Sequence, residues 1–189
     1  MNRDVDYQIT EYLRDFFIAD GAKAMEKAYL QLAEASINKF PQVDDFQEVE
    51  YSFNRLFVGP KALEAPPYAS VYLQEEPNVM GETTMMARSV YEVLGLVSPW
   101  KNTLPDDHIS LELDAAMVIH KLQRYKSVPD MTQLRDLFLE KHMLIWIPMF
   151  CMRIQNAPSC HEAISSVAEA LKDWMDSGIA TGAGLEQYK

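Results

Sequence analysis

Leu56-Phe57-Val58-Gly59-Pro60 closes one apolar segment of the chain, and Pro66-Pro67-Tyr68-Ala69-Ser70-Val71-Tyr72-Leu73 follows it closely. Upstream of the Gly-Pro pair, apolar residues recur with helical spacing, which predicts a helix that starts near Asp44 or Asp45 and ends at Gly59. Its expected buried positions are Phe46, Val49, Phe53, Leu56 and Phe57. Because of its prolines, the second stretch cannot form one long helix. It is too apolar for an idle linker, so we expect it to pack against the helices.

Other segments also carry apolar residues every three or four positions, the spacing of one helix face. They cover residues 9–17, 22–39 and 82–94, a long stretch between Asp107 and Pro129, and residues 132–142, 143–152 and 159–177. The long stretch is apolar on two faces, which predicts a central helix surrounded by its neighbours. No internal repeat and no convincing pair of strands is present. The sequence therefore predicts an all-α fold of about eight to ten helices in a single globular domain, residues 1–189.

Residues 97–105 contain two prolines and show no periodicity. We expect them to form a hinge between two helical groups, residues 1–96 and 106–178. Such a hinge permits exchange of one group between two chains, so a monomer and a domain-exchanged homodimer are both open. Residues 179–189 are expected to form a flexible tail.

Charge and composition exclude several kinds of partner. The 28 acidic and 17 basic residues give a net charge of −11, which repels phosphate backbones and argues against nucleic acid. The amino terminus has no basic stretch that leads into an apolar segment, so we expect no export signal and a cytoplasmic location. The longest apolar run, Met143 to Met152, has ten residues, whereas a membrane-spanning helix needs about 20.

Motifs for metal binding, nucleotide binding and nucleophilic catalysis are not recognisable in the sequence. Cys151 and Cys160 lack the paired spacing of a zinc or redox site. The histidines share no ligand spacing, and no glycine-rich phosphate loop or G-x-S-x-G turn occurs. We therefore expect no metal, no cofactor and no catalytic residues.

Several short motifs occur in a fixed order along the chain. They are Glu50-Tyr51, Leu56 to Pro60, Pro66 to Leu73, Gly81 with Thr84, and Pro105-Asp106-Asp107-His108. In this order the chain resembles the TorD/DmsD/NarJ-like family of redox-enzyme maturation chaperones. The stretch from Leu137 to Phe150 resembles the closing helices of that family, so the similarity covers roughly Asp44 to Phe150.

The resemblance implies a cytoplasmic all-α chaperone that is not an enzyme. Its implied partner is a molybdopterin oxidoreductase of the dimethyl sulfoxide or trimethylamine N-oxide reductase class, bound through its twin-arginine leader, as the apo form, or both. Binding would assist cofactor insertion and proofread the enzyme before export. The positions that match the family's proposed peptide-binding region are Phe53, Leu56, Phe57, Tyr68, Ser70, Tyr72, Thr84, Asp107 and His108. Lys61 departs from the family pattern, since some relatives carry an aromatic residue after the Gly-Pro pair.

A leader with two arginines and an apolar segment needs carboxylates at one end of a hydrophobic groove. Exposed ion pairs contribute only about 0.2–1 kcal/mol each, whereas micromolar binding needs roughly 8 kcal/mol. Apolar burial must therefore supply most of the affinity. We expect a groove built by the helix that ends at Gly59, the proline-rich segment (residues 58–73) and the turn before the long helix.

The same residues also have other interpretations. Aromatic residues at helical spacing fit a plain hydrophobic core. Asp106 and Asp107 are suited to cap the long helix, and their charge is expected to raise the pKa of His108. Two further functions stay open: a small hydrolase or nucleotide-binding enzyme that uses Asp107 and His108 as an acid/base pair, and an assembly factor that grips a folded apoenzyme subunit.

Overall fold

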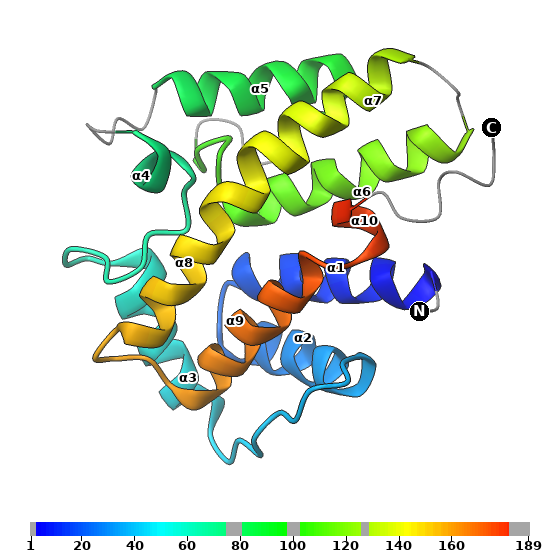
Figure 1. Ribbon diagram of the computed structural model, residues 1–189. Helices are drawn as coiled ribbons and strands as arrows, with labels where there is room; N and C mark the ends of the chain where they lie inside the picture. Colours follow the sequence, from blue (N-terminus) through cyan, green and yellow to red (C-terminus); the bar gives the residue numbers. More distant parts are fainter. Residues whose placement is uncertain (1–2, 75–80, 98–102, 126–128, 182–189) are drawn as a thin grey trace.

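Helices account for the secondary structure of the described residues, apart from a single-residue bridge between Tyr68 and His108 (Figure 1). The computed structural model describes residues 3–74, 81–97, 103–125 and 129–181. The expected all-α fold class is therefore confirmed.

The helices differ widely in length. In chain order they are α1 (Arg3–Phe17), α2 (Ala22–Ala35), α3 (Phe46–Phe53), η1 (Asn54–Val58), α4 (Ser70–Leu73), α5 (Glu82–Leu94), α6 (Ile109–Tyr125), α7 (Pro129–Arg135), η2 (Asp136–Met143), α8 (Leu144–Asn156), α9 (Glu162–Trp174) and α10 (Gly178–Thr181). The segments labelled η are π-helical, so their backbone hydrogen bonds reach five residues back. Within the described ranges, no helix is both long enough and apolar enough to cross a membrane.

The helices fall into two parts that pack on each other through α1 and α6, and one long continuous helical segment passes through both. Figure 1 shows α5, α6 and α7 in the upper part of the molecule and α1, α2, α3 and α9 in the lower part. α7, η2 and α8 follow one another without a break from Pro129 to Asn156, and this rod crosses both parts. The sequence predicted separate helices over 132–142 and 143–152, but no residue between them breaks the helix, and even Pro148 lies inside α8.

The continuous helix formed by α3 and η1 begins and ends where the sequence predicts. The carboxylate of Asp45 caps it by accepting a hydrogen bond from the backbone N–H of Gln47 at 2.8 Å. The helix continues into η1, and the N–H of Gly59 donates to the carbonyl oxygen of Asn54 at 2.8 Å. Gly59 has a φ of 105°, a conformation that favours glycine, so the chain leaves the helix at this residue.

Two other helix ends show where local signals succeed and fail. α5 ends as expected at Gly95, which has a φ of 70°. α2 ends at Ala35, although the sequence predicted an end near Lys39. The reason is that the hydroxyl of Ser36 accepts a hydrogen bond from the N–H of Asn38 at 3.1 Å, which stabilises a turn in place of further helix.

The core is one hydrophobic cluster to which both predicted helical groups contribute. α6 lies at its centre, and Ile109, Leu113, Ala116 and Ile119 are fully buried. α1 and α5 pack on α6 from the first group, and α7 and α10 pack on it from the second. The long helix is therefore surrounded by its neighbours, as predicted. Residues 98–102 of the expected hinge lie outside the described residues.

A buried polar group joins α6 to the rod. Glu112 is fully buried, and its carboxylate contacts Nε2 of His142 at 2.5 Å and accepts the indole N–H of Trp146 at 2.9 Å. Burial raises the pKa of Glu112, against the opposing effect of His142. Burial alone would lower the pKa of His142, but the Glu112 carboxylate outweighs it and the pKa lies above its ordinary value. The pair therefore retains its proton within the core.

Part of the segment predicted to be a flexible tail is helical. Residues 178–181 form α10, in which Ile179 and Ala180 are buried. The N–H of Gly178 donates to the carboxylate of Asp6 at 2.9 Å, which fixes α10 against α1. The prediction of a flexible tail from residue 179 is thus wrong for residues 179–181, because this turn is helical and packs Ile179 and Ala180 into the core. Residues 182–189 lie outside the described residues.

Replacement of Glu112 by Ala should destabilise the protein by about 3–5 kcal/mol, because His142 and the Trp146 N–H then lose their buried partner. Glu140→Ala is the matched control: Glu140 is half exposed and pairs with Arg135 at 2.9 Å, so its loss should cost no more than about 1 kcal/mol. Urea unfolding curves measure both changes. Similar losses in the two variants would contradict the structural role of Glu112.

Candidate functional site

Asp107 joins two other predicted site residues, Ser70 and Thr84, at one buried point. One carboxylate oxygen of Asp107 accepts the backbone N–H of Ser70 at 2.8 Å, and the other accepts the hydroxyl of Thr84 at 3.1 Å. All three residues are buried. The sequence correctly places them together, but the carboxylate is occupied by the protein itself. It holds α4, α5 and the start of α6 together.

The backbone strengthens this junction. The N–H of Ala69 donates to the carbonyl oxygen of Asp107 at 3.0 Å, and the N–H of Ile109 donates to that of Pro67 at 3.0 Å. The proline-rich segment and the turn before α6 thus pair like two short strands. The proline-rich segment also adjoins the helix that ends at Gly59, since the N–H of Ala65 donates to the carbonyl oxygen of Leu56 at 3.0 Å.

His108 differs from the expectation. Its Nδ1 accepts the N–H of Ser110 at 3.2 Å and lies 2.7 Å from the Ser110 hydroxyl, so His108 caps α6 in place of the predicted aspartates. Burial lowers its pKa to about 3. The predicted rise is wrong because the cost of burying a charge exceeds the attraction of the neighbouring carboxylates. Asp106 instead pairs with Arg88 at 2.7 Å.

The apolar residues predicted on the third helix lie in the core. Phe53, Leu56 and Phe57 are at most 3% exposed. The rings of Phe53 and Phe57 meet edge to face at 4.8 Å, and Phe57 also packs against Phe150 of α8 at 5.8 Å. These side chains reach no ligand in this conformation, and of the two interpretations of their spacing the core is the one observed.

Tyr68 and Tyr72 remain half-buried at the surface. The Tyr72 hydroxyl donates to the carbonyl oxygen of Pro66 at 2.9 Å, and its ring stacks on Trp146 at 5.6 Å. The guanidinium of Arg153 lies 5.9 Å from the centre of this ring. Tyr72 thus faces a cation of the protein itself, which disfavours a second guanidinium at this place.

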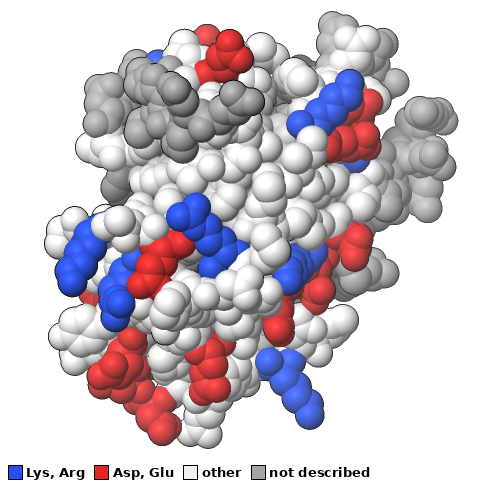
Figure 2. Space-filling view, turned by 60° about the vertical axis from the view of Figure 1, so that its left-hand side comes forward, with Lys and Arg blue, Asp and Glu red and all other residues white. Residues whose placement is uncertain are grey.

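Basic residues recur near this tyrosine. Arg153 donates to the carbonyl oxygen of Glu64 at 2.7 Å, and Arg55 pairs with the Glu64 carboxylate at 3.2 Å. The exposed Lys61 lines a small cavity of about 340 Å³ together with Arg55 and Glu64. Figure 2 shows a wide uncharged area on one face of the molecule, with both basic and acidic residues along its border.

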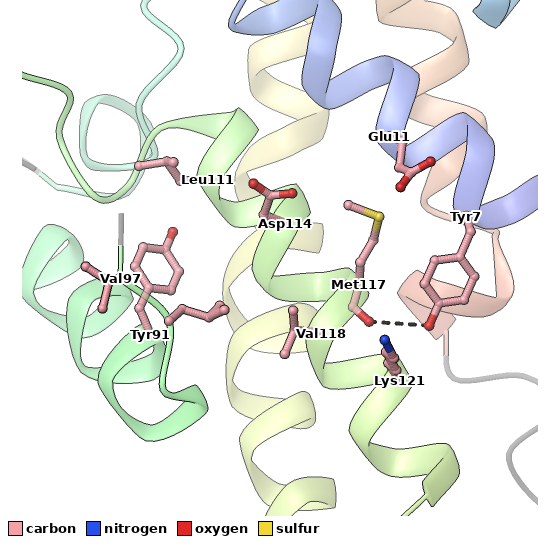
Figure 3. Close-up of a pocket in the computed structure, with 10 residues that line it drawn as sticks. Tyr7, Glu11, Tyr91, Val97, Leu111, Asp114, Met117, Val118 and Lys121 are labelled. Atoms are coloured by element: carbon pink, nitrogen blue, oxygen red, sulfur yellow. Dashed lines mark hydrogen bonds between the residues drawn. The ribbon is translucent and has the colours of Figure 1, made fainter. Parts of the chain in front are cut away.

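A larger cleft lies between α1, α6 and the end of α5 (Figure 3). We call it the α1–α6 cleft. Its volume of about 390 Å³ falls in the range of about 300–1,000 Å³ that is usual for ligand sites. The apolar residues that line it are Tyr91, Leu96 and Val97 at the end of α5 and Leu111, Met117 and Val118 on α6.

Charged side chains complete the lining of the α1–α6 cleft. Glu11 of α1 and Asp114 of α6 contribute carboxylates, and Lys121 contributes an ammonium group two turns further along α6 (Figure 3). Asp114 already binds one guanidinium, since its Oδ1 lies 2.7 Å from Nη1 of Arg14. The cleft therefore combines an apolar lining with carboxylates, one of which demonstrably accepts an arginine.

Sequence reasoning did not find this cleft. Leu111, Asp114, Val118 and Lys121 recur along α6 at helical spacing, and apolar and charged residues alternate among them. This pattern marks one mixed face of the helix. It does not reveal that α1 and α5 leave part of that face uncovered, which depends on how the helices pack.

Comparison with known proteins identifies the family. Residues 19–152 match the family described as nitrate reductase delta subunit. The chain belongs to this family.

In the described ranges, the structure contains no group of three or more His, Cys, Asp or Glu side chains placed to hold a metal ion.

Relatives of this nitrate reductase delta subunit family member include named chaperones. A protein of Haemophilus influenzae described as a probable Tat proofreading chaperone DmsD is 25% identical over 131 residues, which are 68% of this chain and 61% of that protein. The chaperone protein TorD of a Psychrobacter species is 27% identical over 133 residues, which are 69% of this chain and 60% of TorD. The chain thus spans about three fifths of the length of these relatives.

A solved structure shares the fold of this family member. It is described as a candidate redox enzyme maturation protein from Archaeoglobus fulgidus, and it superposes with a TM-score of 0.62 at 18% sequence identity. The superposition covers 94% of this chain and 96% of the other. The likeness extends over nearly the whole helical arrangement.

The substitution His108→Asn should make stability less sensitive to acid. A buried His108 with its lowered pKa stabilises the fold fully above about pH 6.5, and this contribution is lost as the pH falls toward about 3, because only the unfolded chain binds the proton. Asparagine keeps an acceptor for the Ser110 N–H but does not titrate. Unfolding free energies measured between pH 7 and pH 4 should therefore fall less steeply in the variant. Parallel curves for the two proteins would contradict the assignment of a neutral, capping His108.

Proposed function

We propose that this member of the nitrate reductase delta subunit family is a chaperone that binds the twin-arginine leader of a molybdopterin-dependent oxidoreductase, assists its maturation and proofreads it before export. The relatives named as Tat proofreading chaperones and as TorD support this proposal. The names DmsD and TorD favour a client of the dimethyl sulfoxide or trimethylamine N-oxide reductase class. Because proofreading precedes export, the protein acts in the cytoplasm.

The observation that carries the proposal is the α1–α6 cleft. A twin-arginine leader joins two guanidinium groups to an apolar segment, and this cleft joins Glu11 and Asp114 to an apolar lining. The net charge of −11 attracts such a basic peptide from a distance. The region predicted from the sequence is less suitable, because its side chains are buried or lie beside Arg153.

The size of the cleft suits the affinity that a chaperone needs. Micromolar binding requires roughly 8 kcal/mol, and each fully buried apolar side chain contributes about 1.5–3 kcal/mol. Three or four leader side chains in the cleft would therefore supply this free energy before ordering costs are subtracted. The cleft holds part of a leader, and its open side leaves the rest of the peptide free for release to the export machinery.

The hydrolase alternative receives no support from the geometry. The two carboxylate oxygens of Asp107 accept hydrogen bonds from the Ser70 N–H and the Thr84 hydroxyl. Nδ1 of His108 accepts a hydrogen bond from the Ser110 N–H. All of these residues are buried, so a substrate has no path to an Asp107–His108 pair. The assembly-factor alternative differs from leader binding in one measurable respect: its affinity for the client does not depend on the leader.

Leader binding should weaken about tenfold when Val118 is replaced by Asn, because the substitution removes apolar contact from the cleft. The matched control is Val93→Asn: Val93 is 69% exposed on α5 and does not line the cleft, so affinity should stay unchanged. Isothermal titration with a synthetic twin-arginine leader measures both. Equal affinities for all three proteins would exclude the cleft, and no binding by the unmodified protein would contradict the proposed function.

A further inference from the structure

The contacts between α1 and α6 show how the two carboxylates of the cleft are placed. The Tyr7 hydroxyl donates to the carbonyl oxygen of Met117 at 3.4 Å, and seven residues later along α1 Arg14 pairs with Asp114 at 2.7 Å. Residue numbers thus rise on α1 as they fall on α6, so the two helices run antiparallel. Glu11 lies between these contacts, one turn from Tyr7, and therefore faces the part of α6 that carries Asp114 (Figure 3).

We infer that Glu11 and Asp114 bind the paired arginines of the leader, while its apolar segment lies against Leu96, Val97 and Val118. This inference rests on the proposed function and specifies which residues of the cleft bind the arginines and which contact the apolar segment of the peptide. The expected ligand is an arginine pair followed by apolar residues, because the cleft places carboxylates and apolar side chains next to each other.

Arg14 shows that the place accepts a guanidinium. It reaches Asp114 through Oδ1 alone, and it also pairs with Asp15 at 2.8 Å. If a leader arginine takes Asp114, Arg14 keeps Asp15 as its partner. The exchange therefore leaves no unpaired charge on the protein, and the side chain of Asp114, at 43% exposure, is accessible to the incoming group.

Lys121 makes the charge of one end of the cleft differ from that of the other. Lys121 stands seven residues after Asp114 on α6, which is a backbone rise of about 10 Å, toward the other end of the floor. A cation at that end is repelled, whereas a cation at Glu11 and Asp114 is attracted. The arginine pair is thus guided to one end of the cleft. A planar guanidinium group can donate two parallel hydrogen bonds to a carboxylate, whereas the ammonium group of lysine cannot. This difference favours arginine over lysine at the two leader positions.

Fluorescence anisotropy with two labelled synthetic peptides tests the inference. One peptide holds two adjacent arginines followed by apolar residues, and in the other both arginines are glutamine. Glu11→Gln and Asp114→Asn should each weaken binding of the arginine peptide about two- to fivefold and leave the glutamine peptide unaffected. Asp15→Asn is the control, since it also removes a partner of Arg14 but does not line the cleft, and both affinities should remain unchanged.

The outcomes separate the inference from the function on which it rests. If the unmodified protein binds neither peptide, the proposed function fails and the inference fails with it. If it binds the arginine peptide and the Glu11 and Asp114 variants bind it equally well, the inference alone is overturned. Equal weakening by Asp15→Asn would also overturn it, because release of Arg14 would then explain the loss.

Discussion

The carboxylate of Asp107 is the constraint on which the arrangement of this fold depends. It accepts hydrogen bonds from Ser70 and Thr84 inside the core, and the adjoining backbone pairs with the proline-rich segment. A buried carboxylate is stable only when such donors surround it, so α4, α5 and the start of α6 have one permitted arrangement. The floor of the α1–α6 cleft is α6, and one wall is the end of α5. The shape of the cleft is therefore set by a junction that no ligand needs to touch.

This separation explains why the motifs indicate the family: they belong to the parts of the chain that build the fold. The Leu-Phe-Val-Gly-Pro turn ends a helix whose aromatic rings fill the core, and the Asp-His pair closes the junction and caps α6. Both are needed to build the fold. Binding requires less strict residue identities, since an apolar lining with suitably placed carboxylates accepts many peptides. The residues that we assign to the leader, Glu11 and Asp114, lie on two helices without a recognisable motif.

The sequence was sufficient for the fold class, for the helix ends at Gly59 and Gly95 and for the central position of the long helix. Periodicity and glycine signals are local, and Gly59 and Gly95 end their helices where expected. The pKa of His108 was predicted in the wrong direction, because burial is a property of the packed structure and cannot be read from neighbouring charges. The burial of Phe57, by contrast, was expected from its helical spacing, and Tyr72 in the proline-rich segment remains half-buried.

Photo-crosslinking of a bound leader tests the central claim most directly. A twin-arginine leader with a photoreactive residue in its apolar segment is bound to the unmodified protein and irradiated, and the linked residues are identified by mass spectrometry. The account predicts links to Leu96, Val97 and Val118, the residues that line the α1–α6 cleft. Links confined to Tyr68, Tyr72 and the helix that ends at Gly59 would contradict it, and would require the core around Phe57 to open when the leader binds.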